Sequence, residues 1–237
     1  MEERKAGEST GRYTARILDE RHAVWEEKTT TSLMRYAINI DTVFILAERH
    51  NQLASQMASL ENVRDVINQL TPLAEQKNAD AQFELGLAYC EDGAAKDYKQ
   101  AQNWFKKAAK QGIVEAQYNL GLCLIFEDKL FSMGPEYWIE KAAKKGFTQA
   151  QYCLGVFHAT GMTLKKSVHF PKALKWWKKA AKVGHAEAQY TLGIYFNAMR
   201  DQPKKAAPWF VLAANQGHAV AQEKLNDLRA EHKNIKV

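Results

Sequence analysis

The residues of this chain best suited to chemistry are its 7 histidines, its 3 cysteines and a dense set of lysines. No histidine has the His-x-x-x-His or Glu-x-x-His spacing that would place metal ligands on one helical face. Cys90, Cys123 and Cys153 lack zinc-site spacing and are odd in number, so buried reduced thiols are expected. The sequence has no Gly-rich phosphate loop and no G-x-S-x-G nucleophile motif. These residues therefore predict no catalytic centre, no metal site and no cofactor.

Positive charge gathers in the later part of the chain, whose formal net charge is +6 overall. A basic stripe can contact an acidic protein or nucleic acid, or it can be a solvated face, which is the simplest interpretation. Nucleic acid is the weakest alternative because the region has hardly any Arg and no known nucleic-acid module. The clustered lysines are Lys106, Lys107, Lys110, Lys141, Lys144, Lys145, Lys175, Lys178, Lys179, Lys182, Lys204 and Lys205.

The elements that must position these residues are copies of one short motif, which returns about every 35 residues. Repetition at such a period is typical of a solenoid, in which each two-helix unit buries its apolar face against its neighbours. The copies begin at Ala81-Gln82-Phe83-Glu84-Leu85-Gly86, Ala116-Gln117-Tyr118-Asn119-Leu120-Gly121, Ala150-Gln151-Tyr152-Cys153-Leu154-Gly155 and Ala188-Gln189-Tyr190-Thr191-Leu192-Gly193, with a degenerate start at Ala221-Gln222.

Each copy predicts a helix A, a loop and a helix B. In helix B a Trp is followed eight residues later by Gly, as in Trp104 and Gly112. Leu70 and Asn78 have the same separation, and Asn is the next-best residue at a left-handed C-cap, so a half repeat is predicted from near residue 60. Helix A is expected over 79–91, 114–126, 148–159, 186–198 and, last, 219–232, and helix B over 97–110, 135–145, 171–183 and 203–216.

Proline and glycine add two expectations to this scheme. Pro72 and Pro208 fall inside predicted helices, which they should bend, interrupt or start late. Glycine inside a helix costs about 1 kcal/mol relative to alanine, so its return at the same place in each helix A predicts close contact with a neighbouring helix. These glycines are Gly86, Gly121, Gly155 and Gly193.

The pattern A-Q-Y-x-L-G, a loop and A-x-x-W-x-x-x-A-A-x-x-G resembles the Sel-one-like repeat, a relative of the tetratricopeptide repeat. The resemblance implies an all-α, right-handed α-solenoid of helix-turn-helix repeats over residues 59–237. Residues 1–58 do not match and are expected to form an N-terminal helical extension or cap. Copy three departs from the pattern through an enlarged loop at 160–170, which is either functional or simply tolerated.

By analogy with tetratricopeptide geometry, the resemblance implies a concave groove that grips a protein partner. The alternative is that its aromatic residues are packing residues of the repeat. The groove residues so implied are Phe83, Tyr118, Tyr152 and Tyr190, with Leu87, Leu122, Val156 and Ile194 one turn on and Glu115 and Glu187 beside them.

The function predicted is a non-catalytic protein–protein interaction module, with an immunity protein that neutralises a bacterial toxin or effector as its specific form. The alternatives are a hydrolase of the β-lactamase-like repeat type and a general signalling scaffold. The β-lactamase-like relatives resemble disulfide-stapled solenoids with two Cys per repeat, which this chain lacks. No apolar run of membrane-spanning length and no secretory signal is recognisable, so a cytoplasmic location is expected, or a periplasmic one if a signal has been removed.

Overall fold

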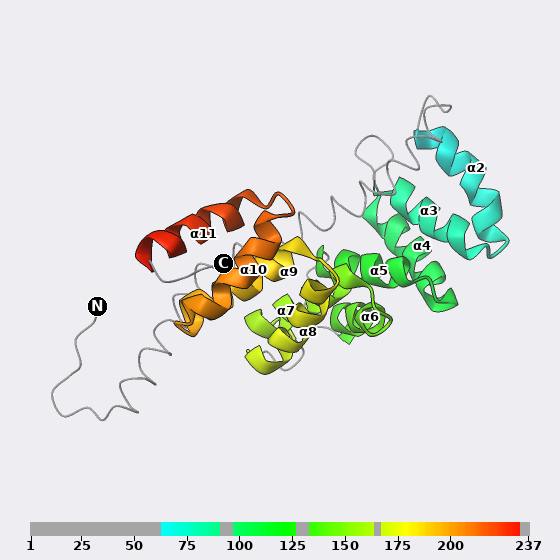
Figure 1. Cartoon of the computed structure of the whole chain (residues 1–237). Coiled ribbons are helices and arrows are strands. Elements are labelled where there is room, and N and C mark those ends of the chain that lie inside the picture. Colours follow the sequence, from blue (N-terminus) through cyan, green and yellow to red (C-terminus); the bar gives the residue numbers. More distant parts are fainter. Residues whose placement is uncertain (1–62, 91–96, 127–132, 164–166, 233–237) are drawn as a thin grey trace. The chain divides into compact units, whose positions relative to one another are not determined.

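The computed structural model describes residues 63–90, 97–126, 133–163 and 167–232. Every element in these residues is helical (Figure 1), and the predicted all-α solenoid of two-helix repeats is confirmed. The described residues divide into two compact units, an N-terminal unit up to Ala173 and a C-terminal unit from Leu174. The predicted extension over 1–58 lies outside the described residues, and the start of the solenoid at residue 59 stays a prediction.

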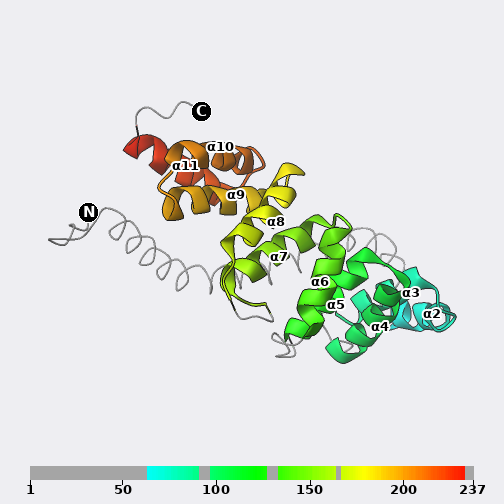
Figure 2. The ribbon, with the colours of Figure 1, turned by 90° about the horizontal axis from the view of Figure 1, so that it is seen from below.

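The helices alternate as the repeat predicts, and within each unit consecutive helices pack side by side (Figure 2). Their bounds agree with the predicted spans to within a few residues. The A helices are α3 (Ala79–Ala88), α5 (Val114–Phe126), α7 (Thr148–Thr160), α9 (Ala186–Ile194), which continues as the π-helical turn η1 (Tyr195–Met199), and α11 (Ala219–Glu231). The B helices are α2 (Val63–Glu75), α4 (Tyr98–Gln111), α6 (Met133–Lys144), α8 (Phe170–Lys182) and α10 (Pro203–Ala214).

A left-handed glycine ends each full helix B and turns the chain into the next helix A. At the end of α4, Gly112 has φ 104°, and its N–H donates to Ala109 O at 3.2 Å. The N–H of Ile113 donates to Ala108 O at 3.2 Å, which completes a Schellman motif. Glycine recurs at this place because a residue without a Cβ adopts positive φ without strain.

The turn from α2 to α3 is built differently from the prediction. Lys77, not Asn78, takes the left-handed conformation, with φ 66°. Asn78 instead caps α3, because its Oδ1 accepts a hydrogen bond from Ala81 N at 2.9 Å. A side-chain acceptor at this place satisfies one of the N–H groups that the first helical turn leaves unbonded. The prediction that Asn78 is the left-handed C-cap is therefore wrong by one residue.

Two prolines lie inside helices that do not stop at them. Helix α2 continues through Pro72 to Glu75, and α10 begins at Pro203 and continues through Pro208 to Ala214. Both Pro72 and Pro208 are exposed, so their rings occupy no space in the helix contacts. Of the effects predicted for these prolines, interruption and a late start do not occur.

Three of the four mid-helix glycines lie where a helix B side chain presses on helix A, as predicted. A Cβ built on Gly86 would lie 2.6 Å from the Phe105 ring, and one on Gly193 would lie 2.5 Å from the Phe210 ring. At Gly121 the neighbour is Ile139 Cγ1, at 2.5 Å. Real Cβ atoms do not approach other atoms so closely, so only glycine allows these side chains to fill the space between the two helices.

In each of the four full copies, the glutamine of the A-Q pair joins helix A to the helix B before it. Gln82 Nε2 donates to Ala74 O at 2.8 Å, and the same buried bond recurs eight residues back at every full copy. Glutamine therefore recurs as the second residue of these pairs because its side chain donates a second hydrogen bond to a backbone carbonyl at the end of helix B. The other three bonds are Gln117 to Ala109 at 3.1 Å, Gln151 to Ala143 at 3.2 Å and Gln189 to Ala181 at 3.0 Å.

The degenerate fifth copy lacks this bond. Gln222 is exposed, and its Nε2 donates to Asn226 Oδ1 at 3.1 Å on its own helix. In copies one and four, a second glutamine, at the end of the following helix B, donates a hydrogen bond to the side-chain oxygen of the first. Gln111 Nε2 donates to Gln82 Oε1 at 2.8 Å, and Gln216 Nε2 donates to Gln189 Oε1 at 2.7 Å.

Lys145→Gln is expected to stabilise the fold by about 1 kcal/mol. Lys145 occupies the place of Gln111 in the next repeat, where Gln117 takes the place of Gln82, and the buried Oε1 of Gln117 has no hydrogen-bond partner among the described residues. A glutamine there can donate to that oxygen and can also replace the bond from Lys145 Nζ to Gly112 O. Urea unfolding followed by circular dichroism measures the gain.

The matched control is Lys144→Gln, which removes the same charge one residue away. Lys144 is exposed and pairs with Glu140 at 2.9 Å, so its loss should change stability by less than about 0.5 kcal/mol. Equal effects of the two substitutions would show that charge, not the amide contact, is responsible.

Candidate protein-binding surface

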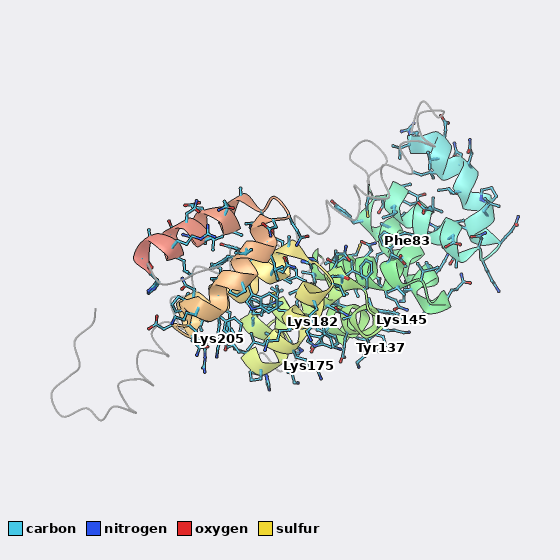
Figure 3. All side chains as sticks on the ribbon, in the orientation of Figure 1. Phe83, Tyr137, Lys145, Lys175, Lys182 and Lys205 are labelled. Carbon is cyan, nitrogen blue, oxygen red and sulfur yellow. The ribbon has the colours of Figure 1, made fainter. Side chains whose placement is uncertain are left out.

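The first three aromatic residues of the predicted groove lie in the core. Phe83 and Tyr118 are 0% exposed and Tyr152 is 1% exposed. Phe83, labelled in Figure 3, packs on Phe105 of α4 with ring centroids 5.8 Å apart, and Tyr118 packs on Phe147 at 5.4 Å. These three side chains therefore pack the repeats, which is the alternative that the sequence left open.

The other predicted groove residues divide in the same way. Leu87, Leu122 and Val156 are buried, and every residue of α7 from Ala150 to Ala159 is buried as well. Partly accessible side chains remain at Glu115 on α5 and, in the C-terminal unit, at Glu187, Tyr190 and Ile194 on α9. A contact role for these four residues stays a prediction.

In the C-terminal unit, His218 brings Glu187 and Tyr190 together. The imidazole stacks on the Tyr190 ring with centroids 4.6 Å apart, and Tyr190 also packs on Phe210 at 6.1 Å. His218 Nε2 lies 3.0 Å from Glu187 Oε1, an ion-pair distance without hydrogen-bond alignment. Nδ1 of His218 accepts from Ala221 N at 3.1 Å and so caps α11.

His185 has the same capping role one repeat earlier. Its Nδ1 accepts from Ala188 N at 3.2 Å at the start of α9. Desolvation by burial lowers the pKa of His185 to about 4, against the smaller opposing effect of the Glu187 carboxylate. Burial likewise lowers the pKa of His158 on α7. Both rings are therefore neutral at pH 7, and His185 accepts a hydrogen bond that its protonated form could not keep.

The B helices carry a repeated pair of tryptophan and lysine. Lys107 Nζ lies 3.5 Å from the centroid of the Trp104 ring on α4. On α6, Lys141 Nζ lies 5.1 Å from Trp138 and 5.9 Å from Tyr137. On α8, Lys179 Nζ lies 4.4 Å from Trp176. Such cation–π contacts hold the ammonium groups at defined places on the outside of the array.

Apolar side chains are exposed beside these lysines. In the N-terminal unit, Tyr137 is 53% exposed on α6, and Figure 3 labels it together with Lys145, the residue that follows this helix. A shallow hollow of about 300 Å³ lies on α4, lined by Trp104, Lys107 and Lys110 among others. In the C-terminal unit the exposed apolar residues include Val183 and Leu212.

Two features of the structure were not predicted from the sequence. The lysines were recognised as a stripe, but their stacking on tryptophan was not, although Trp-x-x-Lys places the two side chains one turn apart on a helix. The fourth copy lacks this signal, because the residue three places after Trp209 is Leu212 and not a lysine. The amide ties of the A-Q pairs were also missed, and only a repeated buried glutamine could have indicated them.

Other kinds of site find little support in the residues described. Within these ranges no group of three His, Cys, Asp or Glu side chains could hold a metal ion. The search of the same residues for a helix able to span a membrane found none. Cys123 and Cys153 are buried and form no disulfide, as expected, and Cys90 is half-buried.

The fold defines a class of protein, the α-solenoids built from two-helix repeats. Comparison with family models matches the Sel1 repeat over residues 79–113, 114–128, 136–147, 148–185 and 186–218, more than half of the chain. Four of these matches begin where α3, α5, α7 and α9 begin. The chain belongs to the Sel1 repeat family, whose repeats generally mediate protein–protein interaction. No curated protein sequence matches the chain significantly.

Solved structures show the same fold. The protective antigen c5321 of uropathogenic Escherichia coli, described as having an SLR fold, is 33% identical over 70% of this chain, with a TM-score of 0.60. The chain spans only 36% of the length of that relative. A Sel1 repeat protein from Oxalobacter formigenes is 24% identical over 82% of this chain and 74% of its own, with a TM-score of 0.58, and shows the fold alone.

Proposed function

We propose that the chain is a non-catalytic module that binds a protein partner. The observation that carries this proposal is the outer surface of the B helices, where lysines held on tryptophan rings lie beside exposed apolar residues such as Tyr137. Tyrosine and tryptophan among positive charges are typical of protein contact surfaces. Membership of a family of interaction repeats supports the same function.

The groove predicted on the A helices is a second surface for this function. Tyr190 and Ile194 are the members of its apolar ladder with partly accessible side chains. Tyr190→Phe keeps the ring contacts with Phe210 and His218, whereas it removes the hydroxyl group that a partner would meet. Weaker partner binding by this variant would support the groove, and unchanged binding would leave the outer surface as the contact.

Affinity purification of the tagged chain from its native host, followed by reconstitution, tests the proposed function. We expect at least one recovered protein, once purified, to form a stoichiometric complex with the chain in size-exclusion chromatography with light scattering. If no recovered protein re-forms such a complex, the proposal is wrong. Turnover of a β-lactam reporter by the purified chain would instead favour the hydrolase alternative.

Neutralisation of a toxin is the specific form of this function that we propose to test. It is supported by the interaction repeats of the family and by a sequence without a recognisable catalytic motif. Expression of the recovered partner alone should then arrest growth, and co-expression with this chain should restore it. A partner that is harmless when expressed alone would overturn the toxin hypothesis and leave an adaptor or scaffold role.

A further inference from the structure

Six side chains on α4 and α6 form what we name the Trp–Lys face of the N-terminal unit: Trp104, Lys107, Lys110, Tyr137, Trp138 and Lys141. The two helices are neighbours, because Lys145 Nζ at the end of α6 bonds to Gly112 O at the end of α4. Trp138 also packs against the core cluster that contains Phe105 and Ala109 of α4. The two halves of the face therefore lie on neighbouring helices.

Among the described residues, no ion pair is found for Lys107, Lys110 or Lys141 of this face. Helix α4 contains Lys99, Lys106, Lys107 and Lys110 and no acidic residue. On α6 the ion pair described joins Lys144 to Glu140 at 2.9 Å. Lysines one helical turn apart repel one another, so this arrangement weakens the free protein slightly. A partner that brings carboxylates would relieve this repulsion.

The lysines of the face are also pre-positioned. A free lysine side chain loses much rotamer freedom when its ammonium group is fixed by a partner. Lys107 already lies 3.5 Å from the Trp104 ring centroid, and Lys141 Nζ lies 5.1 Å from the Trp138 ring and 5.9 Å from the Tyr137 ring. Part of the entropy loss has therefore occurred before binding, which strengthens any contact that these two lysines make.

We infer that the Trp–Lys face is a docking surface for an acidic segment of a protein partner, one that carries an apolar side chain for Tyr137 and the hollow beside Trp104. This inference rests on the proposed function and adds the chemistry of the partner to it. Discrete carboxylates fit the face better than a continuous phosphate backbone, because α6 places Glu136 and Glu140 among its lysines. The Trp104 ring is only 8% exposed and has Lys107 Nζ 3.5 Å from its centroid, so it offers little open surface on which a nucleic-acid base could stack.

The probe for the test is a short fluorescent peptide in which Glu alternates with Phe, measured by anisotropy at physiological ionic strength. We expect Lys107→Glu, Lys110→Glu and Lys141→Glu together to weaken its binding at least about tenfold, because each exposed contact is modest and three are reversed. Tyr137→Ser should weaken binding of this peptide more than binding of an all-Glu peptide, because Tyr137 contacts the apolar side chain.

The matched control reverses three lysines on α8: Lys175→Glu, Lys178→Glu and Lys182→Glu. These lysines are exposed and lie on another helix, and Figure 3 labels Lys175 and Lys182 there. Both triple variants change the net charge equally, so the control should alter peptide binding less than about twofold if the face is specific. Equal weakening by both variants, or no measurable binding of the peptide to the native chain, would overturn the inference.

Two further measurements keep the test decisive. If the triple Glu variant loses its helical circular dichroism, the triple Gln variant replaces it and should weaken binding in the same direction by a smaller factor. A single-stranded oligonucleotide of equal charge is the competing probe, and tighter binding of the oligonucleotide than of the peptide would overturn the inference in favour of nucleic acid.

Binding of the native partner by the Trp–Lys face variants distinguishes failure of this inference from failure of the proposed function. If a stoichiometric partner is recovered and the Trp–Lys face variants bind it normally, the inference is wrong and the proposed function stands. If no partner re-forms a complex, the proposed function fails by its own test, whatever the peptide shows.

Discussion

Phe105→Ala is expected to lower the free energy of unfolding by about 4 kcal/mol. Phe105 is 1% exposed and lies in the core cluster that joins α3, α4 and α5. Its ring packs on Phe83 and also fills the space above Gly86, so its loss leaves a cavity that rigid helices cannot close. Urea unfolding followed by circular dichroism measures the loss.

Gly86→Ala provides the sharper form of this prediction, because the sign of its effect should depend on Phe105. In the native chain the new Cβ would lie 2.6 Å from the ring, so we expect a net loss of about 2 kcal/mol despite the better helix propensity of alanine. In the Phe105→Ala background the ring is absent, and the same substitution should stabilise the fold by about 1 kcal/mol.

Lys106→Ala is the control for this cycle. Lys106 is exposed beside Phe105, so its truncation should change stability by less than about 0.5 kcal/mol. If Gly86→Ala destabilises both backgrounds equally, the Phe105 ring is not the group that excludes a Cβ at residue 86.

Acidification from pH 6.5 to pH 4 is expected to remove about 3 kcal/mol of stability through His185. The folded chain holds the pKa of His185 at about 4, below the 6.5 of an unperturbed histidine. The unfolded chain therefore binds more protons between these two values, so the contribution of His185 is complete above pH 6.5 and is lost as pH falls towards 4. Urea unfolding at a series of pH values measures the slope.

His185→Asn is the variant that isolates this effect. Asn78 shows that asparagine can cap a helix A at the equivalent place, so the substitution keeps an acceptor for the Ala188 N–H but removes the titrating group. The slope between pH 6.5 and 4 should become shallower, and the part that His158 contributes should remain. A slope identical to that of the native chain would show that His185 does not titrate in this range.

Much of the fold could be predicted because one motif recurs at a fixed interval. The A-Q pair, the mid-helix glycine and the Trp-to-Gly spacing place nine of the described helices to within a few residues of their observed bounds. The turn after α2 was misplaced because Leu70 was aligned with the tryptophans, which moved the register by one residue. Lys77 takes the place of glycine there, and lysine gives no sign of a left-handed residue.

The candidate site was harder to predict because an A helix of this family is apolar on every side. Val156 and Tyr152 on α7 would look the same in the sequence whether they lined an open groove or packed a core, and the structure buries both. The lysine-rich outer surface of the B helices was easier to predict from the sequence. Its lysines are clustered in the sequence, but which of them are held in place depends on ring contacts such as that between Lys107 and Trp104.

The amide ties from Gln82, Gln117, Gln151 and Gln189 run across the boundary between one sequence repeat and the next. Helices α4 and α6 are each joined by a buried amide to the helix A after them and by a side chain over a glycine to the helix A before them, so melting should not stop at a repeat boundary. Anyone who shortens, lengthens or recombines this array should place the junctions in the loops between helix A and helix B, since a cut after the turn glycine severs a buried amide from its carbonyl.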